Sequence, residues 1–86
     1  MIPAADRWGP FPDGLDRTER VGRLRTLQAI THLSLGPRGE PLVCELRRAE
    51  TGKVALEYAL AGLNSLAPLD RRRILASYAA LSRPSA

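Results

Sequence analysis

Glycine and proline divide this chain into short segments, and the sharpest division is the run Gly36-Pro37-Arg38-Gly39 near its middle. Such a run forms a turn in any context, because proline fixes one backbone dihedral angle and glycine adopts conformations that other residues avoid. The whole chain has 86 residues. A chain of this length forms one domain at most and buries only about 60% of the surface that it exposes when unfolded. Its core must be thin.

The first fifteen residues are expected to form an irregular arm. Residues 1–15 contain three of the seven prolines, and we place a single small domain after them, over residues 16–83. The arm also carries the only tryptophan and the only phenylalanine, Trp8 and Phe11. Large aromatic side chains are costly to leave in water, so we expect this pair either to cover the small core or to dock on a partner.

A helix is expected directly after the arm. Asp16 followed by Glu19 resembles a capping box, in which both side chains satisfy free backbone N–H groups, so the helix should begin at Arg17. Apolar residues then recur at three-residue steps, which is typical of one helix face. They are Val21, Leu24, Leu27 and Ile30. We expect this helix to run to about Ala29.

On both sides of the central turn, apolar and polar residues alternate, unlike the three-residue spacing of the expected helix. The segment His32-Leu33-Ser34-Leu35 alternates before the turn. After it, Leu42, Cys44 and Leu46 would share one face of a strand over residues 42–47. Two alternating segments around a turn predict a β-hairpin.

Residues 54–63 fit two structures. A strand would place Val54, Leu56, Tyr58 and Leu60 inward, whereas a helix would place Leu56, Ala59, Leu60 and Leu63 on one face. The alanine, leucine and glutamate content favours the helix. Pro68 suits the first position of a last helix, which should end before Pro84. The predicted fold class is α+β: a small, mostly helical domain with an N-terminal helix, a central β-hairpin and a C-terminal helical hairpin.

The residues that usually carry chemistry are scarce. The chain has one histidine, one cysteine and one lysine, which are His32, Cys44 and Lys53. Their spacing matches no nucleophile-and-base pair, no metal-ligand pattern and no phosphate-binding glycine loop. We therefore expect a protein that is not an enzyme and that has no cofactor or metal.

Three consecutive arginines, Arg71, Arg72 and Arg73, fall at the start of the expected last helix. Cations are disfavoured there, because the free N–H groups of a helix start carry partial positive charge. Departures from local rules of this kind often mark function. Consecutive helical residues point about 100° apart, so at most two of the three can face a common anion or acidic partner.

The net charge of +4 also allows nucleic-acid binding, although 12 of the 13 basic residues are arginines, as the codon use of a GC-rich genome would favour. Our first hypothesis is a small non-catalytic interaction or regulatory module that docks on a partner protein or self-associates. The first alternative is a basic nucleic-acid-binding protein that uses Arg17, Arg20 and Arg23 together with the arginine triplet. A second alternative is an accessory subunit of a larger assembly.

The segment from Gly39 to Gly52 loosely resembles the first helix and turn of winged helix-turn-helix repressors. This resemblance implies that residues 53–63 form a recognition helix. Recognition helices read base edges with polar side chains. This segment offers mainly Lys53, Glu57 and Tyr58, and the carboxylate would face phosphates.

The chain is expected to be cytoplasmic and not to bind membranes. A single cysteine rules out an internal disulfide framework and fits a reducing compartment. The N-terminal residues include no apolar core of a signal peptide. No stretch approaches the roughly 18 apolar residues that a spanning helix needs.

Overall fold

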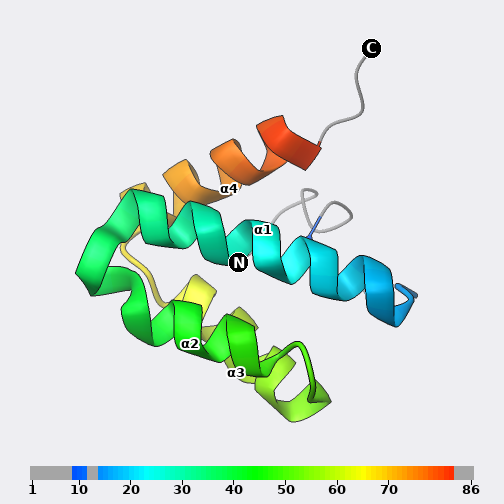
Figure 1. Cartoon of the computed structure of the whole chain (residues 1–86). Helices are drawn as coiled ribbons and strands as arrows, with labels where there is room; N and C mark the ends of the chain where they lie inside the picture. Colours follow the sequence, from blue (N-terminus) through cyan, green and yellow to red (C-terminus); the bar gives the residue numbers. More distant parts are fainter. Residues whose placement is uncertain (1–8, 12–13, 83–86) are drawn as a thin grey trace.

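In the computed structural model, which describes residues 9–11 and 14–82, helices follow one another along the chain (Figure 1). They are α1 (Arg17–Leu35), the 3₁₀ turn η2 (Gly36–Gly39), α2 (Glu40–Arg48), α3 (Lys53–Asn64) and α4 (Pro68–Ser82). Among the described residues there is no strand. The expected α+β class with a central β-hairpin is therefore wrong, and the domain is helical.

Helix α1 begins where the capping pattern predicts and ends later than expected. The Asp16 side chain accepts a hydrogen bond from the Glu19 N–H at 2.8 Å, which confirms the start. The segment expected as the first strand, residues 32–35, is the last turn of this helix instead. Thr31 and Leu35 continue its buried face after Leu27, because their four-residue spacing repeats the helical period. Gly36, with φ of 59°, then ends the helix.

The segment expected as the second strand forms α2. Its buried side chains are Leu42, Val43 and Leu46, and the buried Ala49 follows at the next turn. This spacing belongs to a helix face, whereas Cys44, which a strand would bury beside Leu46, is only half-buried. Pro41 lies in the first turn of α2, where no N–H is needed.

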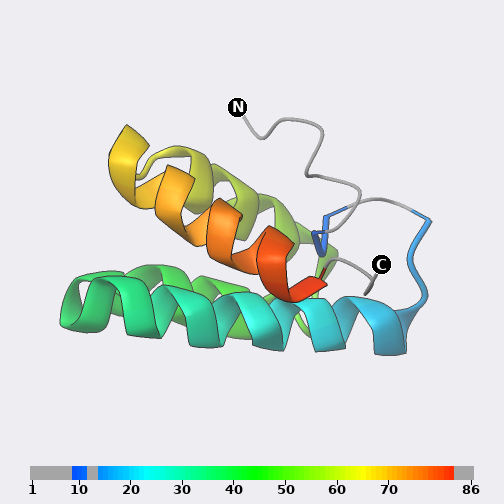
Figure 2. The ribbon, with the colours of Figure 1, turned by 90° about the horizontal axis from the view of Figure 1, so that it is seen from above.

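The helices form two layers. Figure 2 shows α1 beside α2 in one layer, with α3 and α4 in the other. The two C-terminal helices have the bounds expected of a helical hairpin, but α3 packs mainly on α2 and α4 mainly on α1. All four helices contribute to the core, and its most deeply buried side chains are Leu24, Leu27, Leu46, Ala59, Leu63 and Ile74.

The described part of the arm packs on the domain. Gly9 and Pro10 are buried, and Phe11 is half-buried against the core. This position of Phe11 supports the alternative in which the arm covers the core, while Trp8 lies outside the described residues. Within residues 9–11 and 14–82, none of the helices has the length and apolar run that a membrane crossing requires.

Candidate interaction surface

Two of the three α1 arginines expected to contact nucleic acid hold the arm in place. The Arg20 Nε donates a hydrogen bond to the Pro10 carbonyl at 3.0 Å, and an Arg23 Nη donates one to the Gly9 carbonyl, also at 3.0 Å. Arg23 also forms an ion pair with Glu19 at 2.9 Å. The three arginines therefore do not form one exposed basic row, and among them only Arg17 is exposed.

The arginine triplet is divided in the same way. The Arg71 guanidinium donates to the Asn64 carbonyl at 2.7 Å and to the Leu66 carbonyl at 3.5 Å. It thus satisfies carbonyl groups at the end of α3 and in the following loop, which have no partner within the helix. Arg72 and Arg73, the next two residues of α4, are exposed.

We predict that Arg71→Ala lowers the free energy of unfolding by about 1–2 kcal/mol, because two half-buried carbonyls lose a charged donor. Arg72→Ala and Arg73→Ala are matched controls, since the same side chain is removed from an exposed position. Each control should change stability by less than about 0.5 kcal/mol. Urea denaturation followed by circular dichroism measures all three. Equal losses at the three positions would contradict this role of Arg71.

A hollow of about 350 Å³ lies between α2 and α3. We call it the α2–α3 hollow, and it is lined by Glu45, Arg48, Val54, Ala55 and Tyr58. Val54 is 65% exposed and Tyr58 is 64% exposed, and both are among the exposed large apolar side chains of the described residues. Apolar carbon forms most of its wall, and the two charged side chains come from α2.

Helical spacing in α3 explains why Val54 and Tyr58 point outward. Ala59 and Leu63, one turn apart, face the core and are fully buried. Val54 and Tyr58 are also one turn apart, but on the other side of the helix. Gly62 brings α2 close to α3, because a Cβ atom there would lie 3.2 Å from Leu42 Cδ1. The hollow is therefore walled by one turn of each helix.

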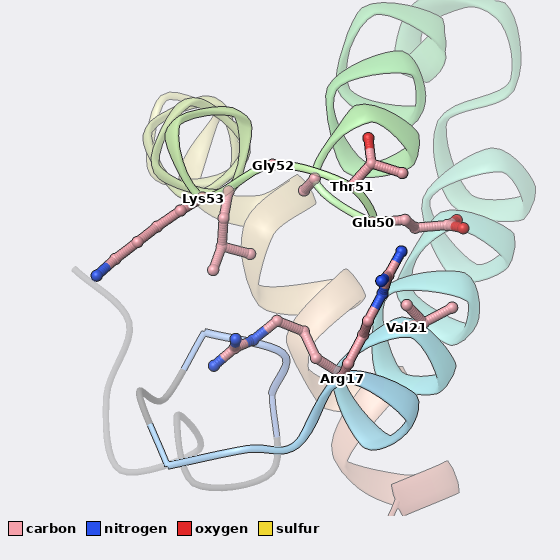
Figure 3. A pocket seen from close by; sticks show the side chains of 9 residues that line it. Arg17, Val21, Glu50, Thr51, Gly52 and Lys53 are labelled. Carbon is pink, nitrogen blue, oxygen red and sulfur yellow. The ribbon is translucent and has the colours of Figure 1, made fainter.

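A second hollow, of about 440 Å³, lies between the start of α1 and the α2–α3 turn. Figure 3 shows Arg17 and Val21 on one side of it, with Glu50, Thr51, Gly52 and Lys53 on the other. The Glu50 carboxylate in this hollow already has hydrogen-bond partners on α1. The Gln28 amide donates to it at 2.7 Å, and the Arg25 Nε donates to it at 3.3 Å. These contacts fix the turn onto α1 and so set the position of α3.

The residues of the helix-turn-helix resemblance do form two helices joined by a tight turn, α2 and α3. The outward face of α3, however, carries one base and one acid among mostly apolar side chains. Its exposed residues are Lys53, Val54, Glu57, Tyr58 and Ala61. Base edges are read by hydrogen-bonding side chains, which this face largely lacks.

The groups considered for chemistry lie apart. His32 is exposed on α1, and Cys44 is half-buried on α2. Within the described part of the chain, no three side chains of the metal-binding types come together. Among the described residues, the α2–α3 hollow is instead marked by adjacent exposed apolar side chains.

No protein-family model matches this chain, and no curated protein or solved structure matches it either. The function must be inferred from the geometry of the surface. The residues of the α2–α3 hollow were not among those expected from the sequence to contact a partner. A signal for them was present, because the helical face through Leu56, Ala59 and Leu63 leaves Val54 and Tyr58 outside it.

Proposed function

We propose that this protein is a non-catalytic interaction module that docks on a protein surface through the α2–α3 hollow. The observation that carries the proposal is the exposure of Val54 and Tyr58 side by side along α3, at the edge of an apolar hollow. Interfaces commonly have an apolar, aromatic-rich centre inside a polar rim, and tyrosine is enriched among the residues that dominate binding. Tyr58 with Val54 would form that centre, and Glu45 with Arg48 part of the rim.

The size of the chain supports the same reading. A thin core gains from burial of further apolar surface, and association is a common way for small domains to obtain it. Exposed apolar side chains scattered singly need no explanation, but adjacent ones beside a hollow mark interaction sites. Leu33, Leu69 and Leu81 are also exposed, and none of them lines either of the two hollows.

Nucleic-acid binding is the weaker candidate. Arg20, Arg23 and Arg71 make hydrogen bonds to backbone carbonyls of their own chain. A nucleic-acid interface instead directs several basic side chains to phosphates, and its affinity falls steeply with salt. The arrangement of these arginines therefore favours a protein partner.

Site-specific crosslinking tests the proposal. We predict that a photoreactive phenylalanine analogue in place of Tyr58 yields a discrete protein adduct on irradiation in the native host. The same analogue in place of Ser77, an exposed position on α4, is the control and should yield none. A protein adduct at position 58 alone supports the proposal. A nucleic-acid adduct, or no adduct at position 58, would overturn it.

A further inference from the structure

We infer that the protein partner at the α2–α3 hollow is a second copy of this chain, bound with the two α3 helices antiparallel around a two-fold axis. This inference rests on the proposed function, because it names the occupant of the same surface. The inference is carried by the charged residues on either side of the apolar residues of α3. Under a two-fold rotation, the acid of one copy meets the base of the other.

The outward face of α3 has an apolar centre. Val54, Tyr58 and Ala61 follow one another at spacings of four and three residues. At about 100° per residue they lie within about 60° of one another around the helix. Two copies of such a narrow apolar row can pack against each other along their length, as the seams of helix pairs do.

Charged side chains border this centre on both sides. Lys53 and Glu57, which we call the outer row, lie on the side of α3 away from α2. Glu45 and Arg48, the inner row, come from α2 and line the hollow. The side of α3 that faces α2 is fixed by Gly62, where a Cβ atom would lie 3.4 Å from a Glu45 carboxylate oxygen. Each row therefore contains one acid and one base.

The four charges of the two rows have no ion-pair partner within the described residues. Elsewhere on the surface, charged side chains do pair across elements. Arg25 lies 3.3 Å from Glu50, and Arg38 lies 3.4 Å from Asp70. The charges around the α2–α3 hollow are thus available to a partner.

A two-fold axis makes each row meet its own copy. In an isologous interface the same patch is used twice, so residue i contacts residue j and j contacts i. With the α3 helices antiparallel and Val54 opposite the second copy's Tyr58, Lys53 of each chain comes within reach of Glu57 of the other. On the other side, Glu45 of each chain faces Arg48 of the other. Both rows are neutral, and both are self-complementary.

Charge reversal on the outer row tests this arrangement. Lys53→Glu makes the row wholly acidic, and Glu57→Lys makes it wholly basic. Each change converts two attractive contacts per dimer into repulsive ones, so we expect the dimer dissociation constant of either variant to rise at least about tenfold. Sedimentation velocity measures it over a concentration series. Both positions are exposed on α3, and circular dichroism checks that the helices remain.

Mixing the two variants gives the decisive result. An acidic row and a basic row complement each other, so equal amounts of the two chains should form a heterodimer at least as tight as the wild-type dimer. The double variant Lys53→Glu/Glu57→Lys should also recover the wild-type constant, because its row is again self-complementary. Arg72→Glu makes the same charge change as Lys53→Glu on α4 and should leave dimerisation unchanged.

The inner row provides a second, independent pair. Glu45→Lys and Arg48→Glu should each weaken the dimer, and their mixture should restore it. If the wild-type chain dimerises but neither mixture recovers association, the inference is overturned, because the contact lies elsewhere. A wild-type chain that remains monomeric also overturns it. In that case a position 58 adduct with a different protein would leave the proposed function standing, whereas a chain with no adduct would lose both.

Discussion

Leu46→Ala is expected to lower the free energy of unfolding by about 2–5 kcal/mol, the usual cost of removing a fully buried leucine side chain. Leu46 has no exposed surface, and it belongs to the core cluster to which all four helices contribute. Alanine would leave a cavity that surrounding side chains fill only in part. Because small domains have a total stability of only about 5–15 kcal/mol, the loss would be a large fraction of it. Thermal and urea denaturation, followed by circular dichroism, measure the loss.

Cys44→Ala is the matched control for this change. Cys44 lies two residues earlier and is only half-buried, so the same measurement should give a loss below about 1 kcal/mol. The comparison also tests the secondary structure. A strand over residues 42–47 would point Cys44 and Leu46 to the same face, whereas α2 separates them. Equal losses at the two positions would contradict the helix.

Helix starts were predictable where local chemistry determines them. Asp16 is followed by Glu19, and the hydrogen bond from the Glu19 N–H to the Asp16 side chain forms as the pattern implies. Pro68 likewise lies at the first position of α4. Capping side chains and proline act within one turn of the chain, so a short stretch of sequence contains the information.

The β-hairpin was wrong because its two segments are too short to distinguish the helical period from alternation. Leu42 and Leu46 are separated by four residues, which fits both structures. The buried Val43 and Ala49 decide for the helix, but their burial depends on packing in the folded chain. The central glycine and proline run predicted a turn, and a turn connects two helices as well as two strands.

The proposed interaction surface was not predicted from the sequence, for a related reason. As a strand, residues 54–60 would turn Val54 and Tyr58 inward, and as a helix they turn outward. The composition favours the helix, whose exposed side then carries Val54 and Tyr58. The charged residues of α2 could not be placed beside it while residues 42–47 were assigned to a strand. Glu45 and Arg48 reach the hollow only because α2 and α3 pack against each other.

The arginines show a further limit of composition. Their number suggested a basic surface, but what each guanidinium contacts depends on backbone carbonyls far away in the sequence. Arg23 donates to Gly9 across 14 residues, and Arg71 donates to Asn64 across seven. Such contacts leave no short-range pattern, so a count of basic residues overstates the surface available to an anion.

Gly39→Ala is expected to lower the free energy of unfolding by about 1–3 kcal/mol through overpacking. Gly39 is buried where η2 meets α2, and a Cβ atom there would lie 2.9 Å from Leu35 Cβ. It would also lie 3.2 Å from both the Thr31 carbonyl oxygen and Thr31 Cγ2. All three atoms belong to α1, so the clash is relieved only if α1 and α2 move apart. Urea denaturation measures the loss.

Gly22→Ala is the control that separates the steric clash of the added Cβ atom from the general effect of replacing a glycine by alanine. Gly22 is exposed within α1, and a Cβ atom there would meet nothing within 4 Å. Alanine favours the helix over glycine, so this variant should be more stable than the wild type by about 0.5–1 kcal/mol. The backbone of Gly39, with φ of −87°, is also one that alanine can adopt. The clash with α1 is therefore the reason why Gly39→Ala should destabilise the protein while Gly22→Ala stabilises it. A stabilising Gly39→Ala would mean that α1 and α2 do not approach as closely as described.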